Sequence, residues 1–284
     1  MKITFTILLF SLISINLFGT AQIPDLIIYK GDTLSLNSCP LNSFPNQDLI
    51  TPKVLFGSRG CFFTSCWRNY VATWEIIDNE LYLCEIRNAC YPTSVRGVSV
   101  SFKSEVDKDS IGSEYADLKV LFPQRFKDGK VKADWVNEKL ISPQGKLLYY
   151  FHDAFESIYE TEIEFTLEKG TLSEIKTLDN SKTKKSKYKD DPKLLKEFVY
   201  KSIKRENLPV ADIIKRCVYV QIVSSDENGK IDRVKVVRGV NELYDNEAIR
   251  VVKSIPEWEV IYRHGKRYNP AWTLPIKFDL TESK

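Results

Sequence analysis

The sequence predicts an α+β protein in which a mainly antiparallel β domain precedes a small α+β domain. The length of 284 residues is more than one domain usually needs. Before residue 180, apolar and polar residues alternate in many short runs, as they do in half-buried strands. The last third instead follows the order helix, hairpin, helix, strand. We therefore expect a β-rich domain over residues 22–179, a linker over 180–191 and an α+β domain over 192–284.

Turn residues divide the first domain into short strands. Hairpins or turns are predicted at Lys30-Gly31, Asp78-Asn79, Asp128-Gly129, Gln144-Gly145 and Lys169-Gly170. Strands at this spacing predict a sandwich or a barrel-like sheet. Five aromatic residues either pack in its core, which half-buried strands favour, or line a ligand groove: Trp67, Tyr70, Trp74, Tyr82 and Trp135.

The predicted linker contains a group of lysines, namely Lys182, Lys184, Lys185, Lys187 and Lys189. Nucleic-acid binding favours arginine or aromatic residues interleaved on a folded face, and the net charge is only +3. We interpret these lysines as solvated and expect no nucleic-acid partner. A helix should follow, with Asp191 as N-cap and Pro192 in its first turn. Its apolar face, expected to pack on the last domain, is Leu195, Phe198, Val199 and Ile203.

The last domain starts with a predicted hairpin. Cys217–Val223 and Ile231–Val237 flank Asn228-Gly229, which is typical of hairpin turns because both residues tolerate positive φ. A helix ending at Pro256 and a strand over Trp272–Leu280 complete it. The helix should turn Leu243, Ala248, Val252 and Ile255 to the sheet and Asp245, Glu247, Arg250 and Lys253 to water. Trp258 is expected to be a core anchor.

Residues 1–21 have the pattern of a secretory signal peptide. Lys2 precedes a mostly apolar run, and Gly19-Thr20-Ala21 offers small residues for cleavage. The alternative is an uncleaved membrane anchor, but polar residues interrupt the run and a bilayer span needs about 20 mostly apolar residues. No later stretch of the sequence is apolar enough to span a bilayer. We expect a periplasmic or otherwise exported protein with no spanning segment after cleavage.

The cysteines are candidates for disulfides in an oxidising compartment: Cys39, Cys61, Cys66, Cys84, Cys90 and Cys217. Cys61/Cys66 and Cys84/Cys90 are close enough in sequence for local bridges. A zinc site is the weaker interpretation, because the spacings are wide and no histidine lies nearby. Free structural thiols are the third possibility, and the connectivity stays open at this point.

No pattern in the sequence indicates catalysis. The histidines, His152 and His264, have no metal-binding partner at a suitable spacing. Nucleophile elbows, zinc-protease motifs and phosphate-binding glycine loops are missing from the sequence. We expect no enzymatic activity, no metal and no cofactor.

One ordered set of residues carries a family resemblance. It comprises Leu208-Pro209, Asn228-Gly229-Lys230-Ile231, the helix Leu243–Val252, Ile255-Pro256-Glu257-Trp258, Gly265-Lys266 and Leu274-Pro275-Ile276-Lys277-Phe278. In this order they make residues 192–280 resemble the C-terminal domain of TonB proteins, the periplasmic partners of outer-membrane transporters. Val260 departs from the pattern, because the family often has a proline shortly after the tryptophan. The long proline-rich spacer of energy-transducing members is also missing.

The resemblance implies that the last strand binds a protein or peptide by strand addition. The expected edge consists of Trp272, Thr273, Leu274, Pro275, Ile276, Lys277 and Phe278. Pro275 cannot donate to a strand ladder, so it favours an edge position. The expected partner is an extended peptide or a TonB-dependent outer-membrane transporter. The alternatives are a self-associating homodimer, an energy transducer if the first segment stays uncleaved, or a strand that only packs on its own helix.

Overall fold

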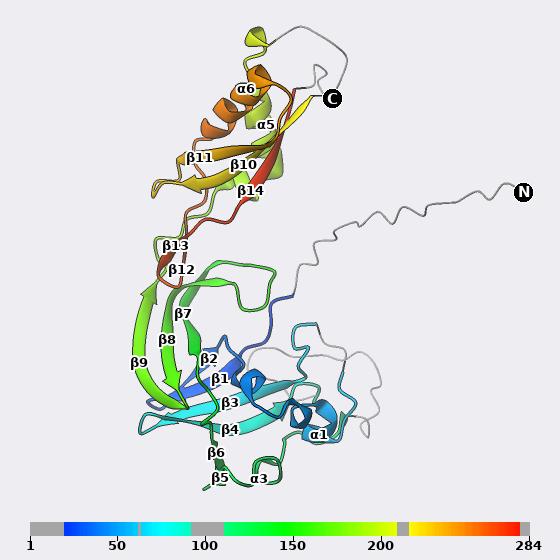
Figure 1. Cartoon of the computed structure of the whole chain (residues 1–284), viewed down its shortest axis with the longest axis vertical. Helices are drawn as coiled ribbons and strands as arrows, with labels where there is room; N and C mark the ends of the chain where they lie inside the picture. The colour runs from blue at the N-terminus through cyan, green and yellow to red at the C-terminus, as the bar shows by residue number, and fades with distance from the viewer. Residues whose placement is uncertain (1–19, 62–63, 92–110, 209–215, 279–284) are drawn as a thin grey trace, which may run out of the picture.

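The computed structural model describes residues 20–61, 64–91, 111–208 and 216–278. It confirms the α+β class, with sheets predominating and helices packed on them. Figure 1 shows two lobes end to end, one drawn blue to green and the other yellow-green to red. No helix in the described ranges is long and apolar enough to cross a membrane. The predicted signal peptide falls mainly on residues 1–19, outside the described residues.

The first lobe is a curled sheet. Its strands are β1 (Asp25–Tyr29), β2 (Asp32–Leu36), β3 (Tyr70–Ile77), β4 (Glu80–Asn88), β5 (Phe126–Lys127), β6 (Lys130–Lys132), β7 (Lys139–Tyr149), β8 (Ile158–Glu168) and β9 (Thr171–Asp179). The main order is β2-β1-β3-β4-β9-β8-β7, antiparallel except between β1 and β3. The two ends of this order meet, because Asn37 N–H donates to Ile141 O and the Ser142 hydroxyl donates to Ser35 O, both at 2.7 Å. The sheet is therefore barrel-like.

The turns of this lobe lie where the sequence predicts them, with one exception. Residues with positive φ occupy the tips at Lys30, Asp78, Asp128 and Lys169. Gly145 also has positive φ (75°), but β7 continues through it as an irregularity in the pairing with β8. The prediction of a turn at Gln144-Gly145 is therefore wrong, because the glycine forms a bulge inside one long strand.

Small helices and aromatic side chains fill the lobe. The helices are α1 (Pro52–Phe56) and α3 (Leu118–Leu121), with short 3₁₀ turns at Pro40–Ser43 and Gln47–Leu49. Trp74 is fully buried, Tyr70 is buried, and Trp135 packs edge-on against Phe44 at 4.9 Å between ring centroids. The core interpretation is confirmed for these aromatic residues. Trp67, in contrast, is 70% exposed.

The second lobe is a three-stranded antiparallel sheet covered by helices. Its elements are α4 (Lys187–Asp190), α5 (Pro192–Ser202), a 3₁₀ turn (Arg205–Asn207), β10 (Cys217–Ser225), β11 (Ile231–Arg238), α6 (Glu242–Lys253), β12 (Ile261–Arg263), β13 (Lys266–Tyr268) and β14 (Trp272–Lys277). The sheet order is β11-β10-β14, and β12 pairs separately with β13. Asp191 caps α5 as predicted, accepting from the N–H groups of Lys193 and Leu194.

The β10–β11 connection is longer than a two-residue hairpin turn. The Asp226 carboxylate accepts from the N–H groups of Asn228 and Lys230, and only Gly229 has positive φ (87°). A side chain at Gly229 would also collide with the backbone of Trp258, whose N–H donates to Gly229 O at 2.7 Å. Glycine is therefore required at this position both by the positive φ of the turn and by the close approach of the Trp258 backbone.

The packing of α6 differs from the prediction at two positions. Tyr244, Ala248, Val251 and Val252 form its buried face. Leu243 is 54% exposed, because Asn241 caps the helix and sets Tyr244 toward the core. Glu247 is buried, and the reason is its ion pair with Arg250.

One disulfide joins Cys61 to Cys90, with 5.9 Å between the Cα atoms. The predicted local bridges Cys61/Cys66 and Cys84/Cys90 are therefore wrong. β4 stays extended from Cys84 to Asn88, a span of roughly 14 Å, and this is too far for a bridge. Cys66 is buried and donates to Tyr70 O.

We predict that Trp258→Ala lowers the free energy of unfolding by about 3–5 kcal/mol, because it leaves a cavity in the second core. Trp258 is 4% exposed and packs with the buried faces of the sheet and α6. Urea unfolding followed by circular dichroism measures the loss. The control Leu243→Ala, at an exposed site on α6, should change stability by less than about 0.5 kcal/mol. Equal effects of the two substitutions would contradict this packing.

Candidate functional site

The strand β14 lies at one edge of the second sheet. It pairs with β10 in one continuous register from Cys217–Lys277 to Ile222–Trp272. Along the described chain no strand pairs with its other side. The predicted edge residues Trp272 to Lys277 form β14, and Phe278 follows it directly.

The direction of each backbone group on β14 follows from one hydrogen bond. Phe278 N–H donates to Arg216 O at 2.9 Å, so Phe278 belongs to a hydrogen-bonded pair with β10. Because such pairs alternate along an antiparallel ladder, Ile276 and Leu274 also bond to β10. Thr273, Pro275 and Lys277 therefore turn their backbone groups to the open side. Pro275 has only its carbonyl to offer on the open side. Because this position makes no hydrogen bond to β10, the missing N–H of proline does not weaken the pairing of the two strands.

The side chains of β14 alternate between core and solvent. Ile276 and Phe278 are buried, and Leu274 packs partly against the same core. Thr273, Pro275 and Lys277 are exposed. An amphipathic strand of this kind keeps its place in the sheet whether or not its outer edge is used.

An apolar trough runs between β14 and α5. It is a hollow of about 350 Å³. Its lining residues are Pro192, Leu195, Lys196, Val199, Tyr200, Leu274, Pro275, Ile276 and Lys277. The helix is only partly buried along its length, and Leu195 and Val199 pack against the edge of the core. The open backbone edge is therefore bordered on one side by an apolar helix face.

An ion pair with a buried carboxylate fixes the end of α5 that leads into the sheet. Glu247 Oε1 accepts from Lys204 N–H and lies 2.7 Å from Arg250 Nη2, and that guanidinium also donates to Ser202 O. The hydrogen bonds from Arg250 hold the pKa of Glu247 below its ordinary value. This pair ties the carboxyl end of α5 to α6 and so holds one wall of the trough.

Two other free edges are protected more strongly than β14. β11 pairs with β10 through three irregularities in register, and Arg233, Lys235 and Arg238 are exposed along it. β9 meets β4 only at Thr171, and it exposes Glu174 and Lys176, which pair with each other at 2.6 Å. Bulges and charged side chains of this kind discourage strand pairing. The hollow beside β14 is lined mainly by apolar residues, whereas the one beside β9 includes Asp179, Lys182 and His264 in its lining.

The first residue of β14 is held by a buried carboxylate. Trp272 Nε1 donates to Glu259 Oε1 at 2.6 Å. The other oxygen of Glu259 accepts from Lys189 Nζ at 2.6 Å and from the Tyr149 hydroxyl at 3.0 Å. Lys189 Nζ also lies 4.4 Å from the ring centre of Tyr149 and 4.2 Å from that of Trp272. We call these four residues the Glu259 clamp.

The clamp joins the two lobes. Tyr149 belongs to β7 of the first lobe, whereas Lys189 on α4, Glu259 and Trp272 belong to the second lobe. The Lys189 side chain is 11% exposed and that of Glu259 only 2%. The prediction that the linker lysines are solvated is therefore wrong for Lys189, although Lys182, Lys184, Lys185 and Lys187 are exposed. An apolar stem and a charged head suit Lys189 to a site between two rings and a carboxylate.

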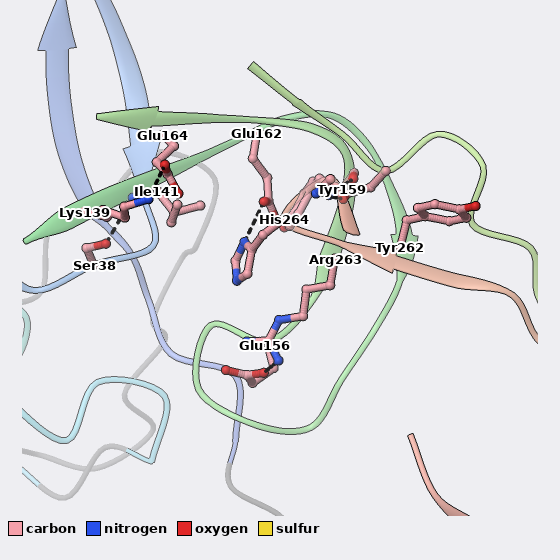
Figure 2. A network of polar contacts seen from close by, with 12 residues as sticks. Ser38, Lys139, Ile141, Glu156, Tyr159, Glu162, Glu164, Tyr262, Arg263 and His264 are labelled. Atoms are coloured by element: carbon pink, nitrogen blue, oxygen red, sulfur yellow. Dashed lines mark hydrogen bonds and ion pairs between the residues drawn. The ribbon is translucent and has the colours of Figure 1, made fainter. Parts of the chain in front are cut away.

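Further polar contacts connect the β12–β13 hairpin to β8 and its neighbouring loop. Figure 2 shows His264 pointing at Glu162 and Arg263 pointing at Glu156. His264 Nδ1 lies 2.7 Å from Glu162 Oε2, and Gly265 N–H donates to Asn180 at 2.9 Å. His264 is therefore a contact between the two lobes, which nothing in the sequence indicated.

The cysteines outside the disulfide show no reactive arrangement. Cys39, Cys66, Cys84 and Cys217 are free thiols. Burial raises the pKa of Cys39 and that of Cys84 to about 12, so both stay protonated near neutral pH. Within the described ranges no group of three His, Cys, Asp or Glu side chains is arranged to hold a metal ion.

No protein-family model matches the chain, and comparisons with curated proteins and with solved structures give no match. The resemblance to the TonB C-terminal domain therefore stays a prediction. The geometry of β14 does not depend on this resemblance.

Sequence reasoning located β14 and missed the features around it. Pro275 marked the edge because proline is tolerated only where no ladder bond is needed. The trough joins residues of α5 and β14 that are far apart in sequence, and the clamp joins Tyr149 to Glu259 across 110 positions. The only local signal for the trough was the apolar stripe of α5, which was interpreted as core packing alone.

We predict that Lys189→Met destabilises the protein by about 3–5 kcal/mol, because it leaves the buried carboxylate of Glu259 without its cation. Methionine keeps the apolar stem between the two rings. The matched control is Lys187→Met, because Lys187 is 63% exposed and lies 4.0 Å from Glu257. The control should change the free energy of unfolding by less than about 0.5 kcal/mol. Thermal and urea unfolding measure both, and equal stabilities would show that the clamp contributes little.

We predict that Glu247→Gln destabilises the protein by about 1–3 kcal/mol at neutral pH, because the charged hydrogen bonds to Arg250 are weakened. Since folding lowers the pKa of Glu247 from 4.5, its contribution is full above that value and is lost as the pH falls through the folded-state pKa. The difference between variant and wild type should therefore shrink in acid. The control Glu197→Gln alters an exposed pair with Lys201. A difference that persists unchanged in acid would contradict the role of the charge.

Proposed function

We propose that this chain is an exported, non-catalytic protein-binding module that recognises an extended peptide by adding it as a strand to β14. The observation that carries the proposal is the open backbone edge at Thr273, Pro275 and Lys277, next to the trough. A strand added there would bond to the free groups of these residues, which supply affinity with little dependence on sequence. The side-chain surroundings would supply selectivity.

The resemblance of residues 192–280 to TonB C-terminal domains supports the same site. It suggests that the partner is an outer-membrane transporter segment or another envelope peptide. The signal-like residues 1–21 and the disulfide are in keeping with an oxidising, exported location. The Glu259 clamp favours an adaptor, because it holds the binding lobe against the β-rich lobe.

Photo-crosslinking in the cell of origin tests this proposal. A benzoylphenylalanine placed at Thr273 or at Lys277 should give an adduct with a second polypeptide, because both positions flank the open edge. The same probe at Lys253, exposed on α6, is the control and should give none. Mass spectrometry of the adduct identifies the partner.

Two results would overturn the proposal. An adduct with the mass of two copies of the chain would replace the adaptor with the self-associating protein. No adduct at either edge position, with normal expression and folding, would remove β14 as a binding site.

A further inference from the structure

The position of α5 constrains the side chains of any strand that pairs with β14. Neighbouring strands lie about 4.8 Å apart and turn successive side chains to opposite faces. α5 lies on the face to which Leu274 and Ile276 point, because these residues line the trough together with Leu195 and Val199. Every second side chain of an added strand would therefore meet the apolar wall of α5.

Apolar side chains can pack against this wall without a desolvation penalty. A polar side chain placed there would lose water without gaining a hydrogen-bond partner. The trough of about 350 Å³ has room for a few aliphatic side chains. The other side chains of the strand would lie on the solvent face, beside Thr273, Pro275 and Lys277.

The charges around the trough have one sign. Lys196 and Lys277 both line it and both are exposed, and no carboxylate is among its lining residues. Neither lysine forms an ion pair within the described ranges, whereas Lys201 on the same helix pairs with Glu197 at 2.5 Å. The rim therefore presents two uncompensated ammonium groups to whatever occupies the edge.

We infer that the trough takes an extended peptide in which aliphatic side chains alternate with carboxylates. The aliphatic side chains enter the trough, and the carboxylates lie on the solvent face near Lys277, while Lys196 at the rim of the trough adds a second positive charge. This inference rests on the proposed strand addition and adds the chemical class of the partner. Charge complementarity at an exposed rim supplies selectivity and association rate more than raw affinity.

Fluorescence anisotropy with the full chain and labelled heptapeptides tests the inference. The probes alternate valine with glutamate in one peptide and valine with lysine in the other. The glutamate peptide should bind about tenfold more tightly at low ionic strength, and the ratio should shrink in high salt. The double variant Lys196→Glu/Lys277→Glu should reverse the preference. Its thermal unfolding should match wild type, because both positions are exposed.

Two further measurements separate the trough from the edge. Val199→Glu, which puts a charge in the apolar wall, should weaken both peptides. The glutamate peptide is also made in two N-methylated forms, one methylated at its valine amides and the other at its glutamate amides. Only one of the two alternating sets of N–H groups faces β14, so one form should lose binding and the other keep it.

The outcomes distinguish the inference from the proposed function. Equal binding of the two peptides, with one methylated form still inactive, would overturn the inference and leave strand addition standing. Binding by both methylated forms would overturn strand addition itself. Failure of both peptides to bind would overturn the inference, and crosslinking at Thr273 would then decide the proposed function alone.

Discussion

The buried carboxylate of Glu259 is the interaction on which the arrangement of this protein depends. Its two oxygens accept from Trp272, Lys189 and Tyr149, which come from β14, α4 and β7. A carboxylate 2% exposed is stable only when its charge is compensated and its lone pairs are satisfied. The ammonium of Lys189 and the two neutral donors meet both requirements. The same contacts fix the start of β14 and attach the two lobes to each other.

The second constraint is the direction in which the backbone N–H and C=O groups of β14 point. One set of its amide groups pairs with β10, and the other faces outward at Thr273, Pro275 and Lys277. Proline at the middle position removes one outward donor without weakening the sheet. α5, held through the Glu247–Arg250 pair, shields one face of this edge and leaves the other in water. The edge is therefore open to a strand and selective about its side chains.

Local sequence signals predicted the elements well and their long-range contacts poorly. The Asp191-Pro192 helix start and most positive-φ turns depend on a few adjacent residues, so they were visible in the sequence. The exposure of Leu243 depends on a cap two residues earlier, and the burial of Glu247 depends on Arg250. Lys189 could not be distinguished from its solvated neighbours, because its partner Glu259 lies 70 residues later in the sequence. The β12–β13 hairpin has strands of three residues each, too short for a clear alternation.

Amide hydrogen exchange of the free protein, resolved by NMR at each residue of β14, shows whether the outer edge of this strand is unpaired. If the outer edge is open, the N–H groups of Thr273 and Lys277 exchange quickly. Those of Leu274 and Ile276, bonded to β10, should exchange slower by orders of magnitude. Such alternation along one strand is expected only where one side of it is unpaired. Protection of Thr273 and Lys277 equal to that of Leu274 and Ile276 would show a covered edge and contradict the account.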